Sequence, residues 1–486
     1  MVENKHRHFF GIRYINGFPS LIFILVLLLN GCESQLEQPN VIFVFGDQWR
    51  AEALGYAGNS QVKTPALDKF ASEAVVFTNA VSTFPVCTPY RASLMTGQYP
   101  LTHRVIYNDK PLETDAISIA DVYKEAGYHT AYIGKWHIDG NERSAFIPKE
   151  RRQGFDYWKV LECTHDYNNS WYWDNDDQKK KWEGYDAIAQ TNDAIGYLKQ
   201  HDGEDPFILF LSWGPPHGPY HTAPEKYRDQ YADPAEILLL PNVPAEKEEV
   251  ARETIAGYYA HIAALDDCFA ALMKAVKEMK LDKNTIIVFT SDHGDMLYSH
   301  SKQKKQKPWN ESVNVPFVIH APGNQTNAGR VLGMPIGTPD LMPTLLGLSG
   351  IPIPGSVEGD DYSDVIYGRE EPGDAAKLIM CPVPFGQGKY SNGGREYRGL
   401  RGVRYTYVED LDGPWLFYDN LEDPYQLNNL VNKPDVQYLQ EKMAVELKSE
   451  LERRGDKFLT GQEYMTAFGL SWYKLDSVKT LQQPSL

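Results

Sequence analysis

The sequence predicts an α/β protein in which a large, mostly parallel sheet is sandwiched by helices. Apolar, β-rich segments such as NVIFVF (40–45) and TIIVFTS (285–291) end abruptly in polar residues. Helical patterns lie between such segments, at 64–74, 118–127 and along a longer stretch through Tyr258. Strands that are apolar on both sides and alternate with helices belong in a parallel sheet covered on both faces.

The alternation of strand and helix patterns ends near residue 370, which predicts a second, smaller part of the chain after it. We expect a catalytic domain at 39–370 and a C-terminal subdomain at 371–486 that packs on it and shapes the cleft. Short strand patterns without helices between them indicate an antiparallel sheet, and one amphipathic helical pattern follows them. These patterns are KLIMCPV (377–383), YRGLRGVRYTYVEDL (397–411) and WLFYDN (415–420) for the strands, and 435–455 for the helix.

Length and charge limit the classes of function. With 486 residues, 42% of them hydrophobic, the chain is long enough for two domains and is not disordered. A net charge of −17 argues against nucleic acid or an anionic membrane surface as an electrostatic partner. An anionic substrate would therefore need a locally basic pocket on this acidic protein.

The N-terminus has the pattern of an export signal. Basic residues precede the apolar run LIFILVLLL (21–29), which is too short to span a bilayer. LNGC (29–32) then resembles a bacterial lipoprotein processing site, although Asn30 is unusual there. We expect a lipoprotein signal peptide at 1–31, a lipid on Cys32, a tether at 32–38, and a protein exported to the periplasm or cell surface.

Polar residues at strand ends predict the position of the functional site. Because open parallel sheets bind ligands beyond the carboxyl ends of their strands, side chains that follow the strands should converge there. Two aspartates among them would repel one another unless a cation or a shared proton offset their charges, and we favour a metal site with oxygen ligands. The convergent set is Asp47, Lys135, His137, His217, Asp292 and His293.

Four cysteines remain after residue 32, and their spacing fits neither a zinc motif nor a dense disulfide scaffold. Cys268 lies in a helical apolar pattern and is expected in the core. A pairing of Cys163 with Cys381 is left open. A predicted helix starts just after Cys87 in STFPVCTPYRASLMTG (82–97), because Pro89 fits a first helical turn. The helix N-terminus and Arg91 favour an anion or a nucleophile there.

Cys87 is a buried structural thiol in one interpretation and a reactive residue in another. A cysteine protease would use His137 or His217 as its base, but the aspartates would have no role. Cys87-Thr88-Pro89-Tyr90-Arg91 resembles the maturation motif of the formylglycine-dependent sulfatases, the type I sulfatases of the alkaline phosphatase superfamily. The resemblance spans about 39–430 in ordered blocks: PNVIFVFGDQWR, GYHTAYIGKWHIDG, PPHGP, FTSDHGDMLYSH, KQKPWNESVNVP, TPDLMPTLLGLSGI and LFYDNLEDPYQLNNL.

The resemblance implies an alkaline phosphatase-like fold and a set of roles. A maturation enzyme would convert Cys87 to formylglycine, whose hydrate attacks the sulfate sulfur. Arg91 and His137 would hold and activate the hydrate. Lys135, Lys305 and His217 would surround the sulfate, and His217 or Lys305 would protonate the leaving oxygen. The implied metal ligands are Asp47, Gln48, Cys87, Asp292 and His293, with calcium expected and manganese or magnesium as alternatives.

Two positions depart from the common family pattern. Many sulfatases have two adjacent aspartates where this chain has Asp47-Gln48, and an asparagine at the position of His293. Both changes lower the negative charge around the metal. The same motifs resemble phosphonate monoester hydrolases and choline sulfatases, so the choice between sulfate and phosphate esters stays open.

We therefore predict a sulfuric ester hydrolase acting on a sulfated carbohydrate. The alternatives are a phosphonate monoester hydrolase or phosphodiesterase of the same superfamily, and a catalytically silent glycan-binding lipoprotein. Lys302 and Lys304 are expected to be surface charge, and His103 and His261 to serve in packing or at the substrate edge. The tryptophans of 168–182 would either stack on sugars or fix an inserted loop.

Overall fold

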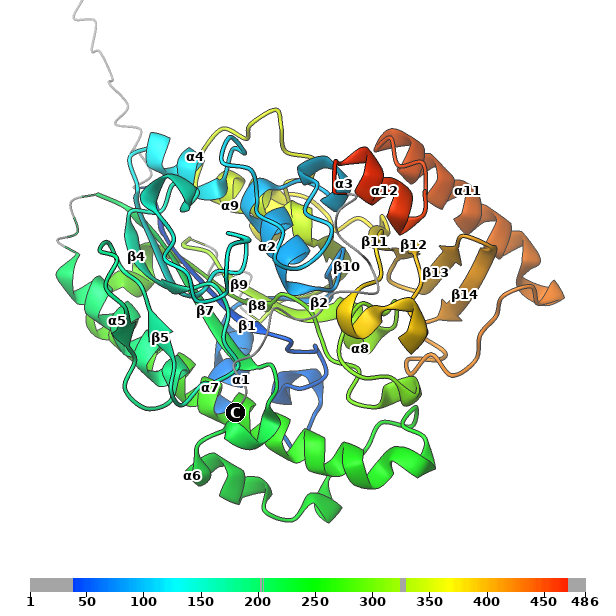
Figure 1. Cartoon of the computed structure of the whole chain (residues 1–486), viewed down its shortest axis with the longest axis horizontal. Coiled ribbons are helices and arrows are strands. Elements are labelled where there is room, and N and C mark those ends of the chain that lie inside the picture. The colour runs from blue at the N-terminus through cyan, green and yellow to red at the C-terminus, as the bar shows by residue number, and fades with distance from the viewer. Residues whose placement is uncertain (1–37, 202, 204, 324–328, 471–486) are drawn as a thin grey trace, which may run out of the picture. The chain divides into compact units, whose positions relative to one another are not determined.

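Eight strands form one large sheet at the centre of the protein, in the order β10-β2-β9-β8-β1-β7-β3-β4 (Figure 1). β9 runs antiparallel to both of its neighbours, β2 and β8, and the other neighbouring pairs are parallel. The strands are β1 (Asn40–Asp47), β2 (Val75–Val81), β3 (His129–Lys135), β4 (Tyr157–Leu161), β7 (Phe207–Pro216), β8 (Thr285–Ser291), β9 (Asn314–His320) and β10 (Val331–Gly337).

The computed structural model describes residues 38–201, 203, 205–323 and 329–470. The expected signal peptide, Cys32 and nearly all of the tether lie outside these residues. Within them, no helix is both long enough and apolar enough to cross a membrane.

Helices cover both faces of the sheet, as predicted, because alternate residues of its strands are buried on opposite sides. On β1, Ile42 and Val44 join the core shared with one helix layer, whereas Val41 and Phe43 join the other. The first layer contains α1 (Pro65–Glu73), α5 (Asp186–Gln200) and α7 (Glu248–Glu278). The second contains α2 (Cys87–Thr96), α4 (Ile119–Glu125) and α9 (Leu341–Leu348).

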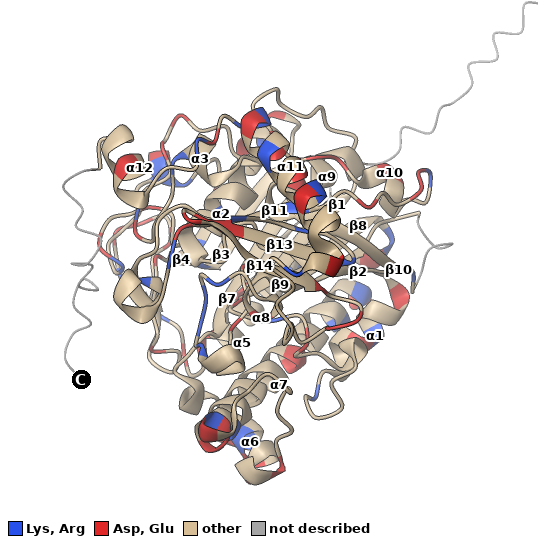
Figure 2. Ribbon diagram, turned by 90° about the vertical axis from the view of Figure 1, so that its right-hand side faces the viewer, with Lys and Arg blue, Asp and Glu red and all other residues tan. Residues whose placement is uncertain are grey.

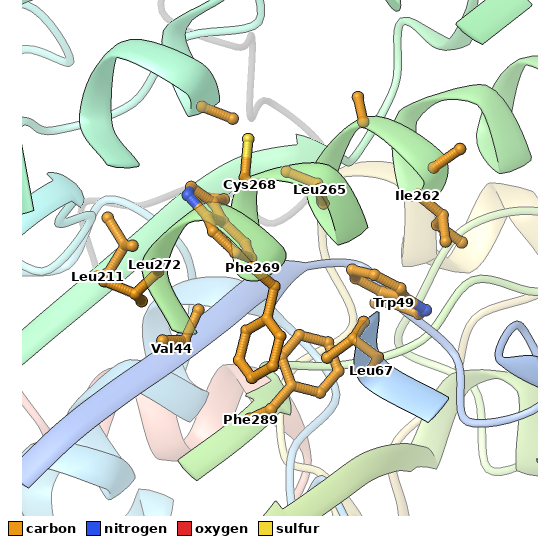
Figure 3. Packing of buried hydrophobic residues seen from close by; sticks show 14 of the residues in the cluster. Val44, Trp49, Leu67, Leu211, Ile262, Leu265, Cys268, Phe269, Leu272 and Phe289 are labelled. Carbon is orange, nitrogen blue, oxygen red and sulfur yellow. The ribbon is translucent and has the colours of Figure 1, made fainter. Parts of the chain in front are cut away.

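Aromatic packing joins α7 to the sheet. The Phe289 ring on β8 lies 5.1 Å from that of Trp49 and 5.7 Å from that of Phe269 on α7, measured between centroids (Figure 3). Cys268 lies next to this cluster and is buried in the core, as predicted.

The C-terminal part has the predicted antiparallel sheet and long helix. Its sheet order is β11-β12-β13-β14, and it shares a hydrophobic cluster with Phe84 and Val86, just before α2. Residues 371–376, where the boundary was predicted, form neither helix nor strand. The elements are β11 (Lys377–Cys381), β12 (Tyr397–Arg401), β13 (Tyr405–Asp410), β14 (Gly413–Asp419), α11 (Gln437–Arg453) and α12 (Gly461–Ala467).

Smaller elements complete the fold. A two-stranded hairpin lies between β4 and α5, and four short helices lie in the connections. They are β5 (Trp171–Tyr172), β6 (Lys180–Lys181), α3 (Pro100–His103), α6 (Glu225–Arg228), α8 (Asn310–Val313) and α10 (Ser363–Ile366). Acidic and basic residues lie side by side on outer helices such as α6 and α11, as Figure 2 shows.

Replacing Phe289 with alanine should destabilise the fold by about 3–5 kcal/mol, because it removes a fully buried ring between two aromatic neighbours. Denaturant unfolding of the variant and the parent protein measures this change. Tyr438→Ala on α11 is the control, since that side chain is 82% exposed and its loss should cost little. Equal unfolding midpoints for the two variants would contradict the packing described.

Candidate functional site

The polar residues at the strand ends do converge. A cavity of about 290 Å³ opens at the carboxyl end of the large sheet, and five of the predicted residues line it: Cys87, Lys135, His137, His217 and Lys305. The remaining ones, Asp47, Gln48, Arg91, Asp292 and His293, are buried. The basic pocket that an anionic substrate needs on this acidic protein is therefore present.

Cys87 is the first residue of α2, one residue earlier than the predicted helix start. The positive end of the helix dipole thus lies at the thiol and favours negative charge there. Arg91, one turn further along the same helix, lies beneath it. Its Nη2 is 3.4 Å from Asp47 Oδ2 and 3.3 Å from Asp292 Oδ2, so one buried guanidinium holds both carboxylates.

Two lysines flank the thiol. Lys305 Nζ is 2.9 Å and Lys135 Nζ 3.9 Å from Cys87 Sγ, and Lys135 Nζ is also 2.5 Å from Asp47 Oδ2. Burial and the Asp47 carboxylate raise the pKa of Cys87, but Lys135, Lys305 and His293 outweigh them and bring it well below its ordinary value. Cys87 is therefore an activated position.

The other cysteines have a different environment. Burial raises the pKa of Cys268 and of Cys381 to about 12, as expected for inert core thiols. Cys163 lines the cavity. Cys87, Cys163, Cys268 and Cys381 are all free, so the structure contains no bond between Cys163 and Cys381.

Asp47, Cys87, Asp292 and His293 could hold a metal ion. Each offers one ligand atom, and these atoms lie within 4.8 Å of one another. Gln48 Oε1 is buried and accepts no hydrogen bond from any described residue, which leaves an oxygen that a cation could satisfy. Two carboxylates and an amide oxygen suit calcium or magnesium, so the residues fit the expected ion.

His217 also lines the cavity. Its Nδ1 is 2.8 Å from the Gly218 carbonyl oxygen, which can only accept, so Nδ1 carries the proton. Nε2 makes no hydrogen bond to a described residue and can face a ligand. Burial, with Lys305 next, lowers the pKa of His217 well below its ordinary value. The ring of His165 stacks on it, with centroids 4.7 Å apart and planes inclined by 18°.

His137 is oriented by a residue that the sequence analysis missed. Its Nε2 lies 3.1 Å from Asp109 Oδ1, and Arg143 holds the same carboxylate with Nε at 3.1 Å and Nη2 at 2.9 Å. His137 itself has left-handed backbone, with φ of 60°. The chain Arg143–Asp109–His137 thus leads from the cavity opening toward Cys87.

Several lining residues were not predicted. Cys163 and His165 follow β4, and the rule about strand ends would have found them had that strand been included. Gln387 and Lys389 come from the C-terminal part, and nothing in their local sequence marks them. The unpredicted lining residues are Asn108, Asp109, Arg143, Cys163, His165, Gln306, Phe385, Gly386, Gln387 and Lys389.

The neighbouring lysines and the tryptophans lie outside the lining of this cavity. Lys302 and Lys304 do not line the cavity, whereas Lys305 does. The tryptophans of 168–182 are not in its lining either: Trp182 is buried in the core, whereas Trp171 and Trp173 are partly buried. A larger hollow of about 420 Å³ beside α1 and β2 has no histidine, lysine or cysteine in its lining.

His103 and His261 serve in packing. His103 is buried between α3 and α2: its Nε2 is 2.9 Å from Ser93 Oγ, and its Nδ1 accepts the Val105 N–H at 3.1 Å. His261 Nδ1 lies 2.6 Å from the Tyr185 hydroxyl. Burial lowers the pKa of His103 to about 3 and that of His261 to about 4.

The chain has relatives among known proteins. A sequence model of the sulfatase family matches residues 39–351, and one described as the C-terminal part of N-sulphoglucosamine sulphohydrolase matches 299–453. The chain is 46% identical to an ulvan-active sulfatase of Formosa agariphila, over 89% of this chain and 84% of the relative. An endo-4-O-sulfatase of Bacteroides thetaiotaomicron is 32% identical, over 85% of this chain and 92% of that protein.

A solved structure has the same fold. It comes from work on glycosaminoglycan metabolism by Bacteroides thetaiotaomicron and superimposes with a TM-score of 0.79 at 30% identity. The match covers 89% of this chain and 99% of the other.

His103 should make stability depend on pH. Its pKa is about 3 when folded, against an ordinary value of 6.5, so the unfolded state binds the extra proton first. Neutral His103 makes its full contribution to the free energy of unfolding above pH 6.5. This contribution falls as the pH drops toward 3, by at most about 1.4 kcal/mol per pH unit. His103→Gln should reduce this slope in denaturant unfolding between pH 6.5 and 4, whereas Val445→Ala, a non-titrating change at a 70% exposed site, should not. Identical slopes would contradict a neutral, buried His103.

Proposed function

The chain belongs to the sulfatase family and is a sulfuric ester hydrolase, and on that premise we propose that it removes sulfate from a sulfated carbohydrate using a formylglycine at position 87. One observation carries the proposal: Cys87 lies at a helix N-terminus between two buried lysines, inside the one described cavity that contains the predicted residues.

The names of the relatives favour a carbohydrate as the substrate. The Formosa agariphila relative is ulvan-active, and the matching C-terminal model is that of an N-sulphoglucosamine sulphohydrolase. A cavity of about 290 Å³ is at the lower end for small-molecule sites, which suits one sulfated sugar unit with the remainder of a chain outside it.

Formylglycine at position 87 would supply a hydrate hydroxyl as the nucleophile toward the sulfate sulfur. The residues around it fit this use. Arg91 and His137 would hold the hydrate. In support, Arg91 Nε and His137 Nδ1 are buried and have no hydrogen-bond partner among the described residues, and Asp109 Oδ1 lies 3.1 Å from His137 Nε2. Lys135 and Lys305 offer positive charge to the sulfate oxygens, where charge must be stabilised as the ester bond breaks.

Protonation of the departing sugar oxygen falls to His217 or Lys305. His217 has its Nδ1 engaged by the Gly218 carbonyl, so its Nε2 is the nitrogen that can exchange a proton with a bound ester. A sulfate held between His217 and Lys305 would favour the protonated imidazole, which offsets the effect of burial.

Asp47, Gln48, Asp292, His293 and the position 87 oxygen would hold a calcium ion, with magnesium or manganese as alternatives. When bound, such an ion polarises sulfate oxygens and lowers the pKa of a coordinated hydroxyl. Arg91 would remain between the two carboxylates and keep them in place.

Export, lipid attachment at Cys32 and maturation by a formylglycine-generating enzyme also belong to the proposal. Their support is the N-terminal sequence pattern and the motif that starts at Cys87. A location outside the cytoplasm would bring the enzyme to polysaccharide substrates.

Protein purified from its native host should carry an aldehyde at position 87 and release sulfate from sulfated oligosaccharides. The tryptic peptide from Phe70 to Arg91 should have the mass of the aldehyde form. Cys87→Ala should lower kcat/KM by about a thousandfold or more, because it removes the nucleophile. Cys268→Ala, a core thiol outside the cavity, is the matched control.

Two outcomes would contradict this function. An unmodified Cys87 in fully active native protein would exclude formylglycine as the nucleophile. A higher kcat/KM for bis(4-nitrophenyl) phosphate than for 4-nitrophenyl sulfate would favour the phosphodiesterase alternative.

Asp47→Asn should weaken calcium binding, because it removes one of two buried carboxylates from the cluster. For the parent protein, calcium at 100 times its Kd should add about 2.7 kcal/mol to stability, seen as a rise in Tm. The variant should lose most of this rise. Glu162→Gln, a buried carboxyl outside the cluster, should keep it, and an unchanged rise in Asp47→Asn would exclude this site.

A further inference from the structure

The cavity has a second set of cations at its opening, separate from those beside Cys87. We define the mouth as the lining residues that are only partly buried or exposed: Asn108, Asp109, Arg143, His165, Gly386, Gln387 and Lys389. Lys135 and Lys305, in contrast, are 3% and 5% exposed and lie near the Cys87 sulfur. The charged side chains of the mouth are therefore more exposed than the two lysines beside the Cys87 sulfur.

Arg143 at the mouth is fixed in position and has one unused face. Its Nε and Nη2 both bond Asp109, and its backbone carbonyl accepts the Cys163 N–H at 3.2 Å. The third guanidinium nitrogen, Nη1, makes no hydrogen bond to any residue that the structure describes. A guanidinium held in this way loses little conformational freedom when it binds a carboxylate or a sulfate.

Lys389 provides the uncompensated charge. Its side chain is half-buried and forms neither an ion pair nor a hydrogen bond within the described part of the chain. The one acidic side chain at the mouth, Asp109, is already engaged by Arg143 and His137. The mouth is therefore locally cationic on a protein whose net charge is −17.

The loop that carries Lys389 is fixed to the catalytic loop. Gln306, next to Lys305, donates from Nε2 to the Phe385 carbonyl at 3.0 Å and accepts the Phe385 N–H at 3.3 Å. Gln306 also donates its backbone N–H to Pro85, two residues before Cys87. These bonds hold the loop in register with the catalytic residues.

We propose that Arg143 and Lys389 form a subsite for a second anionic group of the substrate, a carboxylate or sulfate on the sugar next to the one that is desulfated. The inference rests on the proposed function and narrows its substrate class to polyanionic saccharides. The neighbouring sugar lies at the mouth because the cavity itself has room for about one sugar unit.

A matched set of disaccharides tests this subsite. Each carries the same scissile sulfate, and the neighbouring sugar carries a carboxylate, a sulfate, or the neutral alcohol obtained by reducing the carboxylate. The parent enzyme should have a kcat/KM about tenfold higher for an anionic form than for the neutral one, which corresponds to one charge-assisted contact. The better of the two anionic forms identifies the group. The preference should shrink as salt rises from about 0.05 to 0.5 M.

Lys389→Gln should remove most of this preference by lowering kcat/KM on the anionic substrates alone. Lys389→Glu should favour the neutral substrate. Lys442→Glu makes the same change in net charge at an exposed position on α11, and it should keep the parent preference.

Two results would overturn the subsite. One is equal kcat/KM for anionic and neutral substrates in the parent enzyme, which would leave the sulfatase function intact. The other is a Lys389→Gln variant that loses the same factor on all three substrates. Failure to release sulfate from any of them would instead reject the proposed function, and the subsite with it.

Discussion

The buried guanidinium of Arg91 is the interaction on which the site depends. Asp47 and Asp292 end neighbouring parallel strands, and two carboxylates so close together would be costly without a cation. Arg91 reaches both from α2, the helix that starts with Cys87. Because four residues make about one helical turn, fixing Arg91 against the sheet also fixes Cys87 above the carboxylates. The same contacts of Arg91 therefore determine both the position of Cys87 and the charge balance beneath it.

The part of the site that could be predicted from sequence is the part built by regular structure. Apolar strands that stop at Asp47, Lys135 and Asp292 bring their next side chains to one edge, whatever the loops do. The core position of Cys268 followed in the same way from helical periodicity. Several strands of the sheet were not predicted, β4 and β9 among them. β9 is antiparallel and contains Pro316, so its sequence does not have the continuous apolar character of β1 or β8.

The part of the site that could not be predicted depends on contacts between segments far apart in the chain. A local sequence pattern does not indicate such contacts. Asp109 orients His137 from a loop that is neither strand nor helix, and it does so because Arg143 holds it from a third segment. Lys389 lines the cavity because Gln306 holds the loop that carries it. Gln306 does so by bonding Phe385, which is 79 residues further along the sequence. From sequence alone, a lysine in a loop is interpreted as surface charge. Only the fold shows that this one lines a cavity.

The site is built from the large sheet with α2 and from a loop of the C-terminal part. This division suggests that the residues for chemistry and those for substrate choice are separate. Cys87, Lys135 and Asp292 are held by the sheet and α2, where a change would disturb the buried charge balance. The loop from Phe385 to Lys389 belongs to the C-terminal sheet and touches the catalytic part through the Gln306 amide. Its side chains can change without uncovering a buried charge, since Lys389 has no partner among the described residues to lose. Differences in substrate between relatives should therefore concentrate in this loop, while the residues around Cys87 stay constrained by electrostatics.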